Sequence, residues 1–106
     1  MKVTLREYRR KMRKSNMKDY MYKKVKELID DGLAQMRDYN LSEAKYYIWL
    51  RYSQEVIRIV TNDYNPSIYL NYLRVGMSMD NKLSPAKRVG VCLDYLIGVL
   101  RIIASS

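Results

Sequence analysis

Apolar residues recur along most of this chain at intervals of three and four, the spacing that places them on one face of an α-helix. Five such segments follow one another, at about 4–14, 17–37, 43–61, 66–77 and 85–104. Residues that commonly cap helices precede four of them, at Thr4, Ser42, Asn65 and Ser84. No stretch alternates with the period of two that a strand requires. The sequence therefore predicts an all-α fold, a single compact bundle of four to five helices.

We expect the apolar stripe of each segment to face a common core. In the segment 17–37 the stripe consists of Met21, Val25, Leu28, Ile29, Gly32, Leu33 and Met36. In 43–61 it consists of Ala44, Ile48, Tyr52, Val56, Ile59 and Val60, with Trp49 beside it. In 66–77 it consists of Ile68, Tyr69, Tyr72, Leu73 and Met77.

The last segment is apolar nearly all round, which predicts a helix that is buried on two sides. One face carries Val89, Leu93, Leu96, Ile97, Leu100 and Ile103, and Val91 adds to the other. A central helix wrapped by its neighbours explains the pattern, and a subunit interface is the alternative. The interface would consist of Gly90, Cys92, Tyr95, Gly98, Val99 and Ile102, with the two glycines permitting close approach of another helix.

Length and composition narrow the class of protein. A chain of 106 residues, 48% hydrophobic and 29% charged, has the size and composition of one globular domain spanning 1–106. A single cysteine, Cys92, excludes an internal disulfide and fits a reducing compartment, so we expect a cytoplasmic protein. The longest apolar stretch, 89–104, contains Asp94 and Arg101, so we expect no membrane span.

Charge is distributed very unevenly along the chain. The formal net charge is +9, and residues 1–26 hold eleven basic groups against Glu7 and Asp19. Residues 27–106 hold nine basic and nine acidic groups, so the first quarter carries the whole excess. Such segregation is typical of contact with a polyanion, although a solvated helix face is the alternative.

Four arginines in the stretch REYRRKMRK follow the spacing i, i+3, i+4, i+7 and share one helical face. We expect this basic segment to bind nucleic acid, DNA or RNA, through phosphates, because the guanidinium fork pairs well with them. The predicted binding residues are Arg6, Arg9, Arg10, Arg13, Lys14, Lys18, Lys23 and Lys24. Tyr20 or Tyr22 could stack on unpaired bases, whereas Tyr8 falls on the apolar side.

The sequence offers little for catalysis. Histidine is absent and Cys92 has no acid–base partner nearby, so we expect a protein that is not an enzyme and needs no cofactor. No phosphate-binding glycine motif occurs. Asp30 and Asp31 point about 100° apart on one helix, so we interpret them, together with Asp38, as surface residues and expect no metal site.

Two other functions remain open. One is a helical adaptor or accessory subunit whose basic segment docks on an acidic protein and whose last helix joins an oligomer. The other, weaker one is anchorage to an anionic membrane, for which Leu5, Tyr8 and Met12 give a narrow strip. The hairpin DDGLAQMRDYNLSEAKYYIWL is similar to one unit of a tetratricopeptide or MIT-type hairpin, but it departs at Gln35 and Arg51 and has no second copy.

Overall fold

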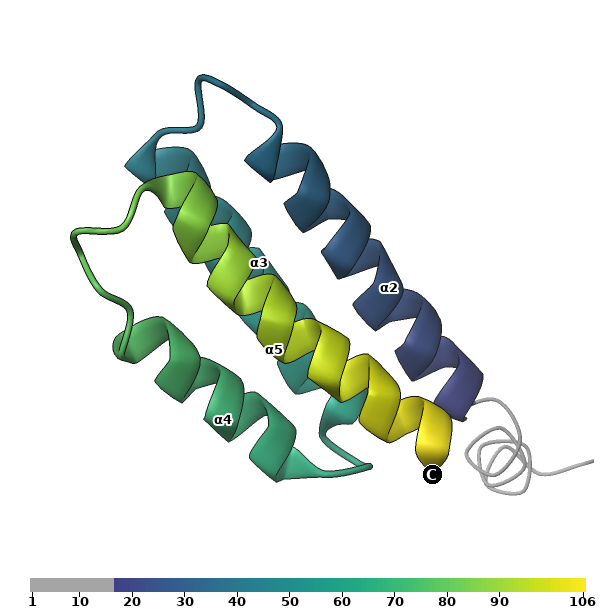
Figure 1. Cartoon of the computed structure of the whole chain (residues 1–106). Helices are drawn as coiled ribbons and strands as arrows, with labels where there is room; N and C mark the ends of the chain where they lie inside the picture. The colour runs from purple at the N-terminus through teal and green to yellow at the C-terminus, as the bar shows by residue number, and fades with distance from the viewer. Residues whose placement is uncertain (1–16) are drawn as a thin grey trace, which may run out of the picture.

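The computed structural model describes residues 17–106, which form four α-helices joined by short turns (Figure 1). The helices are α2 (Met17–Met36), α3 (Glu43–Thr61), α4 (Pro66–Met77) and α5 (Pro85–Ser105). Within the described residues there is no strand, and each helix ends within one residue of its predicted position. The all-α bundle is confirmed, and the helix predicted at 4–14 lies outside the described residues.

Three of the predicted helix caps are confirmed by their hydrogen bonds. The Ser42 hydroxyl accepts from the backbone N–H of Lys45 at 3.1 Å, and the Ser84 hydroxyl accepts from that of Lys87 at 3.3 Å. The Asn65 side chain accepts from the backbone N–H of Ser67 at 3.1 Å, directly ahead of α4. These caps satisfy donors that the first turn of a helix leaves unpaired, which explains why the helices start where they do.

Helix α5 is the central helix of the bundle. It packs against α2, α3 and α4, most extensively against α2, and Figure 1 shows α2 and α4 on opposite sides of it. Its residues Val89, Cys92, Leu96 and Ile103 are fully buried. The sequence-based interpretation of a central helix wrapped by its neighbours therefore holds for most of α5, whereas Ile97 of the predicted core face, together with Val91 and Ile102, is exposed.

The predicted core stripe of α3 is wrong at four of its six positions, whereas Val60 is buried and Val56 partly buried as predicted, and Trp49 beside the stripe is buried as well. Ile48, Tyr52 and Ile59 are 71%, 57% and 59% exposed, and Ala44 is exposed as well. The buried stripe lies on the other side of the helix and consists of Tyr46, Trp49, Leu50, Ser53, Ile57 and Val60. Both sides of α3 are rich in apolar residues, so periodicity alone did not distinguish the face that packs against the other helices.

Smaller corrections apply to the ends of α2 and α4. Leu33 and Met36 on α2 and Met77 on α4 were predicted to lie in the core, but all three are exposed. The two methionines lie in the last turns of their helices, where fewer neighbouring helices remain to cover them. The core positions nearer the middle of these helices, such as Val25, Leu28 and Tyr72, are buried as predicted.

Two buried polar links join elements that are distant in sequence. The Tyr72 hydroxyl on α4 lies 2.7 Å from the Ser53 hydroxyl on α3, which donates to the Leu50 carbonyl at 2.8 Å. Arg88 on α5 is only 3% exposed, and its guanidinium binds the turn that precedes α5 and the start of α3. The sequence pattern had singled out neither link.

Candidate nucleic-acid interface

Three of the eight predicted nucleic-acid-binding residues lie in the part of the chain that the structure describes. Lys18, Lys23 and Lys24 are on the first half of α2, and all three reach solvent. The other five, Arg6, Arg9, Arg10, Arg13 and Lys14, lie outside the described residues. The described contribution to the interface is therefore the basic start of α2, to which the exposed Lys26 also belongs.

The lysines of α2 differ in the partners that their ammonium groups bind. Lys18 donates to the carbonyl oxygen of Ser106 at 2.6 Å, which ties the start of α2 to the end of α5. Lys24 lies 3.4 Å from a Glu27 carboxylate oxygen, an exposed pair of the kind that contributes little to stability. Lys23 is exposed and has no ion pair with another described residue.

Exposed aromatic side chains lie next to these lysines along α2. Tyr20 is 52% exposed, and the ammonium group of Lys24 lies 5.8 Å from the centre of its ring. Tyr22 is also exposed, one residue before Lys23. Exposed tyrosines beside lysines are the combination that binds single strands, because the ring stacks on a base while the cation contacts the phosphate.

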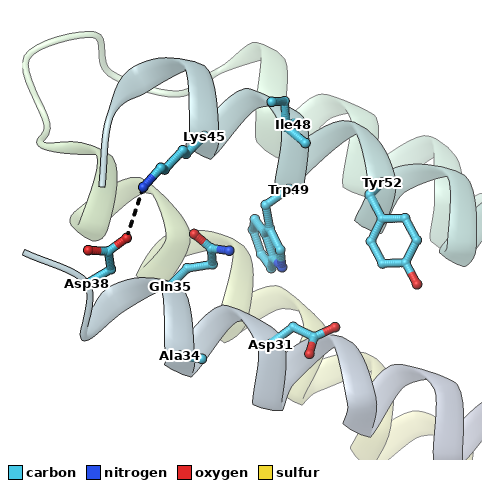
Figure 2. Close-up of a pocket in the computed structure, with 8 residues that line it drawn as sticks. All are labelled: Asp31, Ala34, Gln35, Asp38, Lys45, Ile48, Trp49 and Tyr52. Carbon is cyan, nitrogen blue, oxygen red and sulfur yellow. Dashed lines mark hydrogen bonds and ion pairs between the residues drawn. The ribbon is translucent and has the colours of Figure 1, made fainter. Parts of the chain in front are cut away.

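A pocket opens further along α2, between its last turns and the first half of α3, with a volume of about 550 Å³. Figure 2 shows its lining, which consists of Asp31, Ala34, Gln35 and Asp38 from α2 and the turn after it, and Lys45, Ile48, Trp49 and Tyr52 from α3. The exposed Ile48 and Tyr52 are residues that the sequence had assigned to the core. The pocket is therefore a direct consequence of the way α3 is turned, and periodicity alone did not reveal it.

The two carboxylates of this pocket differ in their hydrogen-bond and ion-pair partners. Asp38 accepts from the backbone N–H of Asn40 at 2.8 Å and lies 3.5 Å from the Lys45 ammonium group. The Asn40 hydrogen bond, aided by Lys45, lowers the pKa of Asp38. Asp31 is exposed and makes neither an ion pair nor a hydrogen bond with another described side chain. Asp31 is therefore the carboxylate that is open to a ligand.

The basic start of α2 and the pocket lie along the same side of that helix. Tyr20, Lys24, Asp31 and Gln35 follow the spacing i, i+4, i+11, i+15, which places them within a sector of about 60°. Since Asp31 and Gln35 line the pocket against α3, Tyr20 and Lys24 lie on the same surface nearer the start of the helix. We call this strip, from Tyr20 to the pocket, the α2 strip.

The six predicted interface residues of α5 differ in how far they are exposed to solvent. Cys92 and Val99 are buried in the core of the chain itself, so they have no surface to offer a second subunit. Tyr95 is half buried, stacks on Tyr72, and donates to the Ile68 carbonyl at 2.6 Å. Gly90 faces the side chain of Met36. An oligomer through the two residues that remain open, Gly98 and Ile102, stays a prediction.

Comparisons with protein-family models, with curated proteins and with solved structures find no match for this chain. Across residues 17–106, no helix combines the length and the apolar character needed to cross a bilayer. In the same part of the chain, no three histidine, cysteine, aspartate or glutamate side chains lie close enough together to hold a metal ion.

Proposed function

We propose that this protein binds nucleic acid, without catalysing a reaction, by contacting phosphates through its basic N-terminal segment and the start of α2. One observation carries the proposal: residues 1–26 hold the entire excess of positive charge, while residues 27–106 are balanced. Phosphate contacts of this kind supply affinity that does not depend on base sequence. Such a protein would act as a small accessory subunit of a nucleoprotein complex.

The described part of the interface favours single strands over duplexes. Tyr20 and Tyr22 are exposed next to Lys23 and Lys24, and their rings can stack only on bases that are not paired within a duplex. Sequence-specific reading of duplex DNA is not part of the proposal, because the arginine stripe contains no Asn or Gln to read adenine.

Salt dependence of binding tests the proposal. Each phosphate that is neutralised contributes about −0.9 to the slope of log affinity against log salt for duplex DNA, and about −0.7 for single strands. The replacement of Arg9, Arg10 and Arg13 with Gln should flatten this slope by roughly two to three units, with similar losses on unrelated sequences. A matched control replaces Lys82, Lys87 and Arg101, three exposed cations of the balanced part of the chain, and should leave the slope nearly unchanged.

The alternative function is a protein adaptor whose basic segment docks on an acidic partner. It would take first place if the wild-type protein bound neither DNA nor RNA at low salt, or if the triple arginine variant bound as well as wild type. Circular dichroism must show that the variant keeps its helical content, so that loss of binding is not loss of fold.

A further inference from the structure

Trp49 is the one tryptophan of the chain, and it occupies an unusual position. The side chain is 5% exposed, yet its indole nitrogen is a buried donor that has no hydrogen-bond partner among residues 17–106. Buried N–H groups are nearly always paired, since an unpaired one has lost its bonds to water without replacement. The Trp49 nitrogen is therefore a donor that lacks an acceptor within the described part of the chain.

The indole ring bridges from α3 to α2 within the pocket. Figure 2 shows its nitrogen at the end of the ring that faces α2, on the side of Asp31. Gly32, next to Asp31, makes room for the ring, because a Cβ there would lie 3.0 Å from Trp49 Cζ2. The pocket thus places one unpaired donor near one unpaired carboxylate, with Tyr52 and Ile48 on either side.

We propose that this pocket binds an unpaired guanine base. The Watson–Crick edge of guanine presents the O6 acceptor, then the N1–H donor, then the N2 amino donor. O6 would accept from the Trp49 indole N–H, while the two donors would pair with the two oxygens of Asp31, which only accept when ionised. The Tyr52 ring supplies a surface on which the base stacks.

The other bases fit this arrangement less well. Adenine and cytosine each offer one amino group beside a ring acceptor, so one Asp31 oxygen would face a lone pair. Uracil and thymine offer a single N–H between two carbonyls, which also leaves one Asp31 oxygen opposed by an acceptor. Bidentate pairs of this kind discriminate strongly between bases, because the wrong base leaves a desolvated group unpaired.

The α2 strip also supplies contacts for the rest of the strand. Tyr20 and Lys24 lie on the same side of α2, about 16 Å and 10 Å from Asp31 along the helix axis. A strand that placed a guanine in the pocket could therefore stack a neighbouring base on Tyr20 and contact Lys24 and Lys23 with its phosphates. For its strand-binding part this inference rests on the proposed function, and the basic segment would supply the affinity that is common to all sequences.

Binding must include a movement of side chains. The Trp49 nitrogen is covered in the free protein, so at least one neighbouring side chain has to move before O6 can reach it. This movement would change the surroundings of the sole tryptophan. Its fluorescence therefore reports directly on occupation of the pocket.

Labelled single strands measured by fluorescence anisotropy test the base preference. The strands are oligothymidylate and the same strand with one central guanine, adenine or cytosine. We expect the guanine strand to bind roughly tenfold more tightly than the others. Asp31→Asn should abolish this preference, and its affinity for oligothymidylate should match that of Asp30→Asn, which loses the same negative charge. The matched control Asp30→Asn, one residue away and pointing about 100° elsewhere, should keep the preference.

A second measurement separates failure of this inference from failure of the proposed function. Guanosine 5′-monophosphate alone should change Trp49 fluorescence in wild type and in Asp30→Asn but not in Asp31→Asn, and the monophosphates of the other three bases should have little effect. Equal binding of all four strands, or no selective response to the guanosine nucleotide, would overturn the guanine site while leaving phosphate binding intact. A selective response without binding to any strand would support the guanine site and overturn the proposed function.

Discussion

Gly32 and Gly98 are single residues in opposite environments. A Cβ at position 32 would lie 2.5 Å from Leu93 Cδ2 and 3.0 Å from Trp49 Cζ2, whereas a Cβ at position 98 would meet nothing within 4 Å. Both positions are inside helices, where alanine is intrinsically preferred to glycine. The difference between the two sites is therefore one of packing, and helix propensity is common to both.

An alanine at each position should change stability in opposite directions. We expect Gly98→Ala to raise the free energy of unfolding by about 0.5–1 kcal/mol, because it improves helix propensity at no steric cost. Gly32→Ala should lower it by about 1–2 kcal/mol, since overpacking against Leu93 and Trp49 outweighs the same gain. Urea unfolding followed by circular dichroism measures both. A stabilised Gly32→Ala variant would show that the Trp49 ring does not need the room that glycine gives it.

At the scale of elements, Arg88 holds three parts of the bundle together. Its guanidinium donates to the carbonyls of Leu83 at 3.0 Å and Asn81 at 2.7 Å in the turn before α5, and to a Glu43 carboxylate oxygen at 3.1 Å at the start of α3. It also lies 5.6 Å from the centre of the Tyr46 ring. Buried arginines are uncommon unless their donors are paired, and here the fork of the guanidinium serves several acceptors at once.

Removal of the Arg88 side chain should weaken the fold. We expect Arg88→Ala to lower the free energy of unfolding by about 2 kcal/mol, because hydrogen bonds to a charged group are lost. Arg88→Lys should recover only part of this, since an ammonium group lacks the planar fork. Arg101→Ala, an exposed arginine on the same helix, is the control and should change stability by less than about 0.5 kcal/mol. Equal effects at positions 88 and 101 would contradict the role of Arg88.

For helix α3, the sequence pattern predicted the ends of the helix but not its buried face. Its start and end could be predicted because Ser42 is a cap residue and the turn TNDYNPS interrupts the apolar spacing. Its buried face could not, because Tyr46, Leu50 and Ile57 on one side compete with Ile48, Tyr52 and Ile59 on the other. Tyr46 and Ser53 look polar in a sequence, yet the buried surroundings of Arg88 and Tyr72 accommodate them.

On the scale of the whole molecule, the core holds several groups that resist ionisation. Burial raises the pKa of the Cys92 thiol from an ordinary 9.0 to about 11, and it also raises the pKa of Tyr46 and Tyr72. Below pH 9 these groups are protonated in both the folded and the unfolded chain. Between about pH 9 and 11 the unfolded thiol loses its proton while the folded one keeps it, so stability falls as pH rises through this range.

Alkaline unfolding therefore provides a test that involves the entire core. We expect the free energy of unfolding to fall progressively above pH 9, and the fall up to about pH 11 to be smaller by about 2 kcal/mol in Cys92→Ala. The buried tyrosines should maintain part of the decline in that variant. The comparison concerns the slope with pH, because Cys92→Ala also loses packing at neutral pH. The same slope in both proteins would contradict burial of a protonated thiol.

The sequence by itself determined the elements of this protein and the imbalance of its charge. Helix positions follow from local rules, since caps at Ser42, Asn65 and Ser84 and the prolines after two of them act within one turn of the chain. The concentration of basic residues in 1–26 is likewise a property of sequence alone. These features require no knowledge of what packs against what.

Only the tertiary structure decided which surfaces meet. It turned α3 so that Tyr52 and Ile48 are exposed, buried Cys92 and Val99 within the chain, and brought Asp31 of α2 to the same pocket as Trp49 of α3. The physical reason is that an apolar side chain gains the same free energy against any close-packed neighbour, so a helix with two apolar sides has no local preference between them. Packing of all the described helices together determines which side of α3 is buried, and the pocket between α2 and α3 results from that packing.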